Sequence, residues 1–252
     1  MIVPSSLKLL PRLPAFVRSS VSMSTSEGLN PTQEALLQEP CILVDESDIA
    51  IGQASKRDCH LRHEKYGGGS PLHRAFSLFV FNEKNELLMQ QRSKEKITFP
   101  GMWTNTCCSH PLAVPEEQVM EGGLGAKRAA QRRMFNELGV TKEHCPIAEM
   151  IYLTRILYAA SSSDRWAEHE LDYILMLRTK TAIPIVPNPN EVMNHEYVGK
   201  GQLKDFIAAA KHRGDGITPW FQLIANSLLL KWWENIDNIE DHQDHVTIKK
   251  FY

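Results

Sequence analysis

The 252-residue sequence lacks any apolar run close to the roughly 20 residues that a membrane-spanning helix requires. Its net charge at pH 7 is only −2, which excludes a broad basic surface for nucleic acid. Cysteine is scarce: five residues do not form a disulfide-stapled scaffold, and we expect free thiols in a reducing compartment. Internal repeats and long low-complexity tracts are missing as well. These absences favour one globular domain with no membrane or nucleic-acid partner. We also expect a monomer.

Acidic residues are missing before Glu27, in a segment where Lys8, Arg12 and Arg18 stand among many serines. This bias is typical of a mitochondrial transit segment, and a disordered tail is the equally weighted alternative. Prolines interrupt the short apolar pieces there, which disfavours a secretory signal. The C-terminal residues "IKKFY" do not form the usual peroxisomal tripeptide. We therefore expect the cytosol or the mitochondrion as the compartment.

The spacing of apolar residues predicts both strands and helices. Strands are expected over 41–55 and 73–92, each as strand–turn–strand, and over 148–160 and 169–178. Helices are expected over 124–138, which Gly139 would end, and over 203–211 and 219–233. Because strands and helices do not alternate regularly, we expect an α/β (α+β) domain, a mixed β-sheet sandwiched by helices. The domain would span 36–240, with an N-terminal extension at 1–35 and a C-terminal tail at 241–252.

Histidines and glutamates form a possible metal-binding set. The histidines to be weighed are His60, His63, His73 and His110, the last in a loop that reads "TNTCCSHP". Each one alone is better explained as an ordinary polar residue. Glu168 and Glu170, however, lie two apart in a predicted strand and would share one face, unless that face is simply solvated. Together these side chains could bind Mg²⁺, Mn²⁺ or Zn²⁺, although the spacing is not that of a zinc finger.

The predicted helix 124–138 ends in "RRMFNELGV", which resembles the end of the Nudix box. The residues that fit the pattern are Arg132, Met134, Glu137, Gly139 and Val140. Arg133 and Asn136 stand where Nudix hydrolases have glutamates, so the fold signal remains while the carboxylates for hydrolysis are largely missing. The alternative is any amphipathic helix with an Arg133–Glu137 pair at i, i+4.

Basic residues near the predicted strands could bind an anion. Lys56, Arg92 and Lys96 are natural partners of a diphosphate, although each alone is more simply a surface charge.

Taken together, these stretches resemble type I isopentenyl diphosphate isomerase. The most specific match is "FPGMWTNTCCSHP", preceded by "HRAF" and followed by "WAEHELDY". Further matches are "QQRSKEKITFPG", "AAQRRMFNELG", "YLTRILY" and "TPWF", in the right order between Cys41 and Trp233. The family interconverts isopentenyl and dimethylallyl diphosphates in isoprenoid biosynthesis. The resemblance therefore implies a Nudix-like domain, a divalent metal and a small-molecule diphosphate substrate.

The resemblance also implies roles for individual residues. The metal ligands would be His60, His73, His110, Glu168 and Glu170, with His63 outside the pattern. The catalytic groups would be Glu170 and Cys108, because the family's thiol lies two residues before the loop histidine and so is not Cys107. The diphosphate-binding residues would be Lys56, Arg92, Lys96, Ser109 and Arg133. Glu137 corresponds to a carboxylate near a second Mg²⁺, which would bridge the substrate's phosphates beside the protein-bound Mg²⁺, Mn²⁺ or Zn²⁺.

Moving a double bond by one carbon needs an acid and a base on opposite faces of the hydrocarbon. An aromatic face must stabilise the cationic intermediate, and Tyr158 with either Trp103 or Trp220 could supply it. The family's bacterial members have an aromatic residue after "TPW", where this chain reads "FQLIA", so the choice stays open. We expect Trp232 and Trp233 to pack in the core. Water must be excluded, so we expect part of 50–70, including "YGGGSP", to order when substrate binds.

Two other functions fit parts of this pattern. The first is a true Nudix hydrolase of nucleoside diphosphate derivatives, which the incomplete Nudix box disfavours. The second is a metal-binding interaction module without catalysis. In that case the basic residues would have no reason to converge with the metal ligands.

Overall fold

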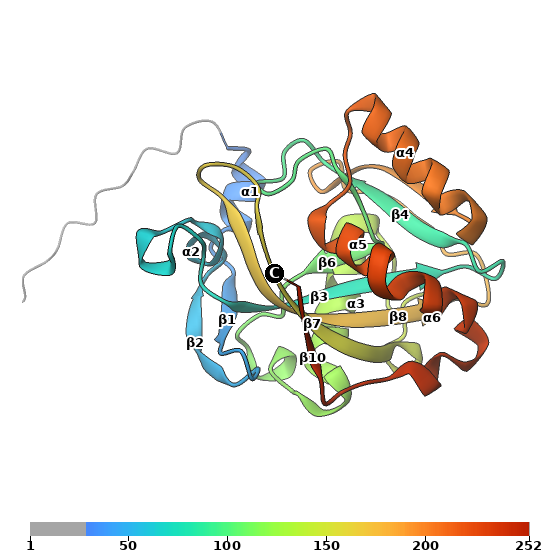
Figure 1. Ribbon diagram of the computed structural model, residues 1–252, viewed down its shortest axis with the longest axis horizontal. Helices are drawn as coiled ribbons and strands as arrows, with labels where there is room; N and C mark the ends of the chain where they lie inside the picture. Colours follow the sequence, from blue (N-terminus) through green and yellow to red (C-terminus); the bar gives the residue numbers. More distant parts are fainter. Residues whose placement is uncertain (1–28, 252) are drawn as a thin grey trace, which may run out of the picture.

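The structure, a computed structural model, describes residues 29–251 (Figure 1). The first 26 residues, expected to be a transit segment or a tail, lie outside the described residues. Across 29–251, no helix combines the length and the apolar character needed to cross a bilayer.

Ten strands form one branched sheet in the described part of the chain. They are β1 (Pro40–Val44), β2 (Ala50–Ser55), β3 (His73–Phe81), β4 (Leu87–Arg92), β5 (Trp103–Thr104), β6 (Cys107–Ser109), β7 (Ile151–Ser161), β8 (Ala167–Arg178), β9 (Val192–Val198) and β10 (Ile248–Phe251). The main path runs β10-β7-β8-β3-β1-β2, while β6 and β4 also pair with β3, and β5 and β9 pair with β4. Strand β3 is central, with β8 parallel to it and β6 antiparallel.

The helices are α1 (Pro31–Leu36), α2 (Lys56–His60), α3 (Leu124–Leu138), α4 (Leu203–Arg213), α5 (Pro219–Ile224) and α6 (Leu230–Glu234). A π-helical turn at Ala225–Leu229 joins α5 to α6. Short 3₁₀ turns lie at Glu64–Tyr66, Pro115–Glu117, Glu121–Gly123, Ile147–Glu149, Lys200–Gln202 and Ile236–His242.

Side chains of β3 divide between two cores, because successive residues of a strand face opposite sides. Phe76 and Leu78 pack in the core that includes the inner side of α3. Phe79 and Phe81 pack in the core that includes α5 and α6. Figure 1 shows α3 behind the sheet and α5 and α6 in front of it. Burial of each such side chain contributes about 1.5–3 kcal/mol, and the layers are the expected mixed sheet between helices.

The bounds of α3 confirm the predicted helix, and Gly139 follows it with φ of 66°, the left-handed conformation that ends many helices. The strand–turn–strand predicted for 73–92 is confirmed by β3 and β4, although these two strands pair with each other only at Phe81–Leu87. Strand β4 instead pairs along its length with β9, which the sequence did not predict. The helix expected over 219–233 is present but is interrupted by the π-helical turn.

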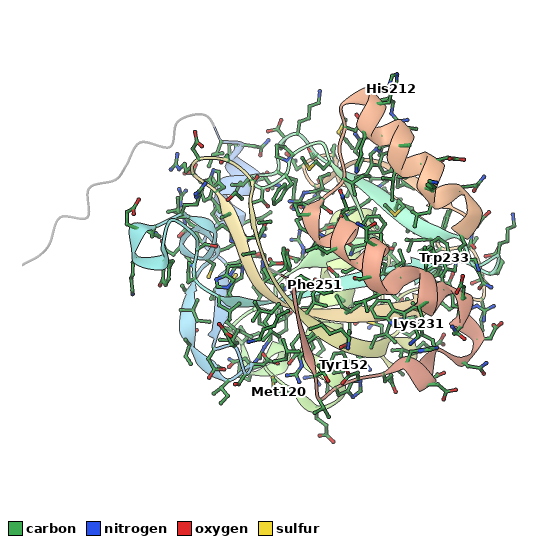
Figure 2. The ribbon with its side chains drawn as sticks, viewed as in Figure 1. Met120, Tyr152, His212, Lys231, Trp233 and Phe251 are labelled. Carbon is green, nitrogen blue, oxygen red and sulfur yellow. The ribbon has the colours of Figure 1, made fainter. Side chains whose placement is uncertain are left out.

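Trp232 and Trp233 pack in the core, as predicted. The Trp233 ring meets the Phe81 ring edge to face, with the ring centres 5.0 Å apart. Its indole N–H donates to the backbone oxygen of Asn85 at 2.7 Å. Figure 2 shows Trp233 on the red end of the chain, where α6 covers the sheet.

Two segments assigned by sequence to the flanks of the domain pack against its body. Gln33, on α1, is 3% exposed. Strand β10 pairs in parallel with β7, with Phe251 opposite Tyr158.

Candidate active site

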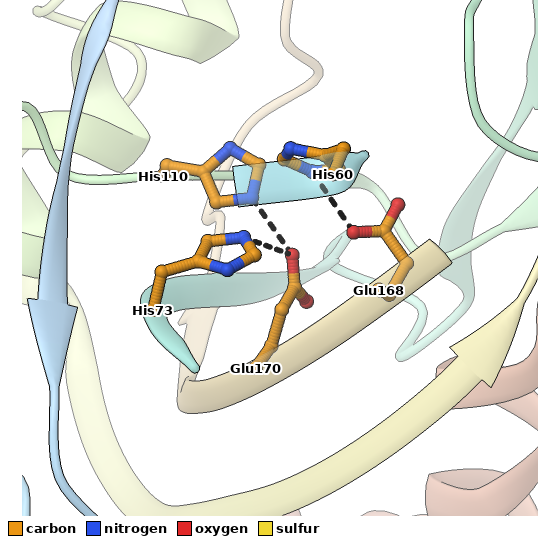
Figure 3. Close-up of side chains that lie close together, drawn as sticks. All are labelled: His60, His73, His110, Glu168 and Glu170. Atoms are coloured by element: carbon orange, nitrogen blue, oxygen red, sulfur yellow. Dashed lines mark hydrogen bonds and ion pairs between the residues drawn. The ribbon is translucent and has the colours of Figure 1, made fainter. Parts of the chain in front are cut away.

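Five side chains from four segments meet at one end of the sheet (Figure 3). His60 ends α2, His73 opens β3, and His110 directly follows β6. Glu168 and Glu170 lie two apart on β8, and the β3–β8 register places His73 opposite Glu170. The ligand atoms of all five residues lie within 4.8 Å of one another, and all five residues are buried. The structure therefore brings together the five residues that the resemblance implied as metal ligands.

The ring nitrogens of this group are oriented by the backbone. His60 Nδ1 lies 2.7 Å from the Lys56 carbonyl oxygen, and His73 Nδ1 lies 2.9 Å from that of Pro71. These carbonyls accept hydrogen bonds from Nδ1–H, so Nε2 is the ring nitrogen that faces the group. His73 Nε2 is buried and has no hydrogen-bond partner among residues 29–251. A buried, unpaired nitrogen of this kind is what a metal ligand provides.

The carboxylates complete the donor set. Glu168 Oε2 lies 2.9 Å from His60 Nε2. Glu170 Oε1 lies 2.7 Å from His110 Nε2 and 3.7 Å from His73 Nε2. Imidazole nitrogens and carboxylate oxygens in this number suit a divalent cation, so the residues fit the metal that the family resemblance implies.

Burial sets the protonation of this group. It lowers the pKa of His73 to about 3, with the His60 charge as the next cause, and lowers that of His110 well below its usual value. Burial, followed by the Glu168 charge, raises the pKa of Glu170 well above its usual range. For Glu168 burial is outweighed by the His60 ring, and its pKa falls to about 2. For His60 burial is outweighed by the Glu168 charge, which raises its pKa. Neutral imidazoles, which burial favours for His73 and His110, are the form that binds metals, and a carboxyl with a raised pKa can hold a proton.

A small cavity lies against these five residues, which form the candidate metal-binding group. Its lining includes four of the five predicted diphosphate-binding residues: Lys56, Arg92, Lys96 and Ser109. Arg133, the fifth, does not line it and is 1% exposed. Burial, followed by the charges of Lys96 and Arg133, lowers the pKa of Lys56. The cationic side chains of Lys56, Arg92 and Lys96 therefore line the same cavity, as an anion-binding site requires.

The two adjacent cysteines point in different directions from β6. Cys108 is partly exposed and lines the cavity together with Glu170. Cys107 is fully buried in the core beneath α3, with its sulfur 3.6 Å from a Glu137 carboxylate oxygen. Burial raises the pKa of the Cys108 thiol to about 12, and Arg92, whose Nη1 lies 4.0 Å from the sulfur, is the largest opposing influence.

Of the aromatic residues proposed from sequence, Trp220 lines the cavity, whereas Tyr158 contacts Glu170 and does not line it. The Tyr158 hydroxyl donates to Glu170 Oε2 at 2.5 Å. Trp220 lines the cavity, and its ring centre lies 6.2 Å from that of Tyr158. Trp103, the other tryptophan considered from sequence, does not line the cavity and packs against Phe206. Of the two tryptophans, Trp220 is the one beside the catalytic candidates.

Glu137 lies outside the group of five ligands. Its Oε1 accepts from Arg133 at 2.6 Å, and its Oε2 accepts from Gln90 at 3.0 Å. Arg133 also binds Glu191, a buried carboxylate that the sequence reasoning missed. Glu191 lies just after a turn of prolines and asparagines, and no local pattern distinguishes it from an ordinary loop residue.

The chain is similar to known proteins in sequence and in fold. The family model described as NUDIX domain matches residues 71–221. Isopentenyl-diphosphate Delta-isomerase 1 of Bos taurus is 48% identical over 226 residues, which cover 90% of this chain and 98% of that protein. Isopentenyl-diphosphate Delta-isomerase I of Camptotheca acuminata is 45% identical over 223 residues, covering 87% and 94%.

A solved structure shows the same fold. DR0079 from Deinococcus radiodurans is 20% identical, with a TM-score of 0.50 over 75% of this chain and 99% of that chain. At this identity the likeness concerns the fold alone. The curated relatives match over nearly their whole lengths, and they do so across all four segments that form the metal-binding group. The chain belongs to the isopentenyl-diphosphate Delta-isomerase family, within the Nudix superfamily.

Proposed function

We propose that this protein is an isomerase that interconverts isopentenyl diphosphate and dimethylallyl diphosphate. The observation that supports this most directly is that Cys108 and Glu170 line one small cavity whose wall also contains Lys56, Arg92 and Lys96. A thiol and a carboxyl can exchange protons with a hydrocarbon, and the cations can hold a diphosphate that does not itself react.

In the forward direction Glu170 gives a proton to the terminal alkene carbon. Burial raises the pKa of Glu170, which favours the protonated carboxyl that this step needs, and the Tyr158 hydroxyl holds the other oxygen in place. Cys108 then removes a proton from the carbon on the other side of the cation, so that the double bond has moved by one position. Arg92 is the neighbour that favours the thiolate form of Cys108. The same two groups exchange roles in the reverse reaction.

The intermediate between these two proton transfers is a carbocation, which Trp220 and Tyr158 stabilise. An aromatic face attracts a cation by about 2 kcal/mol or more in a desolvated site. Trp220 is 3% exposed and Tyr158 is 1% exposed, so both rings also exclude the water that would trap the cation.

The protein-bound metal belongs in the group formed by His60, His73, His110, Glu168 and Glu170. When bound, a divalent cation supplies positive charge that orients the carboxylates and increases the acidity of the Glu170 carboxyl. A second Mg²⁺ would be held by the substrate's diphosphate next to Glu137. Both carboxylate oxygens of Glu137 already accept hydrogen bonds from protein side chains. We therefore propose that the diphosphate, and not a preformed protein site, would supply the ligands of this Mg²⁺.

Incubation with isopentenyl diphosphate and Mg²⁺ in deuterated water tests the function. We expect dimethylallyl diphosphate that contains deuterium at the new methyl group, detected by NMR. Release of phosphate from nucleoside diphosphate derivatives, with no isomerisation, would instead identify a Nudix hydrolase. Metal binding without either reaction would identify an interaction module.

We also propose that the chain works as a monomer in the cytosol or the mitochondrion. The basic, serine-rich start of the sequence supports the mitochondrial alternative. Import of the full chain into isolated mitochondria, with shortening of its N-terminus, distinguishes the two compartments. Sedimentation of the purified chain tests the monomer.

A further inference from the structure

A single carboxylate joins two of the cations behind the cavity wall. Glu191 Oε2 lies 2.5 Å from Lys96 Nζ and 3.0 Å from Arg133 Nη2. Because both nitrogens contact the same oxygen, they lie no farther apart than these two distances together. Without the carboxylate between them, two positive charges at that separation repel each other.

Glu191 is held in this place by several contacts. Its other oxygen, Oε1, accepts from the Gln33 side-chain amide at 3.3 Å. Its backbone oxygen accepts from Ser93 N–H at 2.9 Å, which fixes it beside the loop that contains Lys96. The residue is 3% exposed, so its charge is screened little by water. Burial opposes ionisation, but the charges of Lys96 and Arg133 outweigh it and hold the Glu191 pKa far below its usual value.

The position of Glu191 separates it from the reacting atoms. Lys96 lines the cavity, whereas Glu191 does not. Cys108 and Glu170 line another part of the same cavity, where the hydrocarbon would lie. Any effect of Glu191 on the substrate must therefore pass through the cation that it holds.

We propose that Glu191 is a positioning residue for diphosphate binding. It holds the Lys96 ammonium at the cavity, and it neutralises the repulsion between Lys96 and Arg133. Lys96 is then already ordered before the diphosphate binds. Binding therefore does not incur the entropy cost of ordering a flexible lysine side chain. This inference rests on the proposed function for the identity of the substrate, and it names a residue that acts on binding and not on proton transfer.

Steady-state kinetics with isopentenyl diphosphate at fixed Mg²⁺ tests the role of Glu191. We expect Glu191→Gln to raise KM about tenfold, the size of one charge-assisted hydrogen bond, and to change kcat less than about twofold. Glu191→Asp keeps the charge on a shorter side chain and should give a KM between the two. Lys96→Met should also raise KM. Adding Glu191→Gln to Lys96→Met should raise it little further, because both changes remove the same interaction.

A matched control separates this role from general stabilisation. Asp48 is also a buried carboxylate between two cations, with oxygens 2.9 Å from Arg74 Nε and 2.9 Å from Arg155 Nη1. Asp48→Asn should lower the melting temperature and leave KM unchanged. The inference is wrong if Glu191→Gln leaves KM unchanged while lowering the melting temperature, or if the double variant shows additive effects. It is also wrong if KM falls, since Glu191 would then compete with the diphosphate for Lys96.

Calorimetric titration with inorganic diphosphate and Mg²⁺ separates this inference from the proposed function. We expect Glu191→Gln to weaken diphosphate binding about tenfold relative to the wild-type protein. If the wild-type protein binds diphosphate in this way but does not isomerise, the proposed function fails and the role of Glu191 stands. If the wild-type protein isomerises and both proteins bind diphosphate equally, only the role of Glu191 fails.

Discussion

Two chemically identical side chains at positions 107 and 108 have different environments because they are neighbours on a strand. The two-residue period of β6 sends Cys107 into the core beneath α3 and Cys108 toward the cavity. Cys107 has its sulfur against Glu137, whereas Cys108 has its sulfur near Arg92. Only the second thiol can therefore reach a substrate.

Replacing each cysteine separately tests this difference. Cys108→Ala should reduce kcat by about 10²–10⁴-fold, the usual contribution of one acid–base group, with the melting temperature nearly unchanged. Cys107→Ala should keep activity and lower the stability by about 1 kcal/mol, because it leaves a small void in the core. Steady-state kinetics and thermal unfolding of both variants give the answer. Activity that survives the first change and is lost with the second would assign the thiol to Cys107.

The role of a single residue can be predicted from sequence when the residues that define that role lie close to it in the chain. The five candidate metal ligands and Cys108 could be proposed because the family resemblance rests on short motifs that contain them. Glu191 could not, because its contacts with Lys96 and Arg133 span 95 and 58 residues. Arg133 was proposed as a diphosphate ligand, but a linear motif does not reveal that its guanidinium faces buried carboxylates.

At the scale of elements, the start of α3 is fixed by a close approach between two backbones. A Cβ atom on Gly125 would lie 2.2 Å from the Glu117 carbonyl oxygen. The same turn ties the helix to the site, because Glu117 accepts from Leu112 N–H and from the Arg132 guanidinium. Arg132 in turn donates to the backbone oxygen of His110, a member of the metal-binding group.

Gly125→Ala should therefore push α3 away from this turn. We expect a loss of about 1–3 kcal/mol of stability from the overlap, together with weaker metal binding through the displaced His110 loop. Gly201→Ala is the matched control, because no atom lies within 4 Å of the added methyl group. Chemical denaturation measures the first effect and metal titration the second. Equal stability of the two variants would contradict the close approach.

Strand β10 is attached by a charged turn. Asp244 accepts from Thr247 N–H at 2.9 Å and from Lys249 Nζ at 2.9 Å. These contacts, the backbone one first, lower the Asp244 pKa below its usual value. A depressed pKa in the folded state means that the ionised carboxylate stabilises the fold above the ordinary pKa of about 4, and that this contribution disappears as the pH falls toward the depressed value.

Asp244→Asn should therefore lower the melting temperature at pH 7, and the difference from the wild-type protein should shrink below about pH 4. Asp241→Asn, at an exposed position nearby, is the charge-matched control and should change little at either pH. Thermal unfolding at a series of pH values measures both. A difference for Asp244→Asn that grows as the pH falls would contradict a stabilising role for the ionised carboxylate.

Elements with strong local signals could be predicted, whereas their pairing could not. The bounds of α3 follow from three- and four-residue spacing and a terminal glycine. Strands β3 and β4 were also predicted, but the strands that pair with them were not. Strand β3 pairs along its length with β8, and β4 pairs along its length with β9. These partners lie about 90 or more residues away in the sequence, so no local pattern specifies the pairing.

At the scale of the whole molecule, the metal-binding group connects segments that are distant in sequence. His60 belongs to the N-terminal part with β1, β2 and α2, whereas Glu168 and Glu170 belong to the β7–β8 hairpin. A cation bound to all of them therefore joins these parts of the fold. A ligand that binds only the folded state stabilises it, by about 2.7 kcal/mol when its concentration is 100 times Kd.

Removal of metal by a chelator should accordingly lower the melting temperature, and adding a divalent cation back should restore it. His60→Gln should reduce this shift, because it removes one ligand and the connection to α2. His212→Gln is the matched control: His212 is exposed at the far end of α4 (Figure 2), and its loss should leave the full shift. Thermal unfolding with and without chelator, together with elemental analysis of bound metal, measures the effect. A shift of the same size in all three proteins would place the stabilising cation somewhere other than the group at the end of β3 and β8.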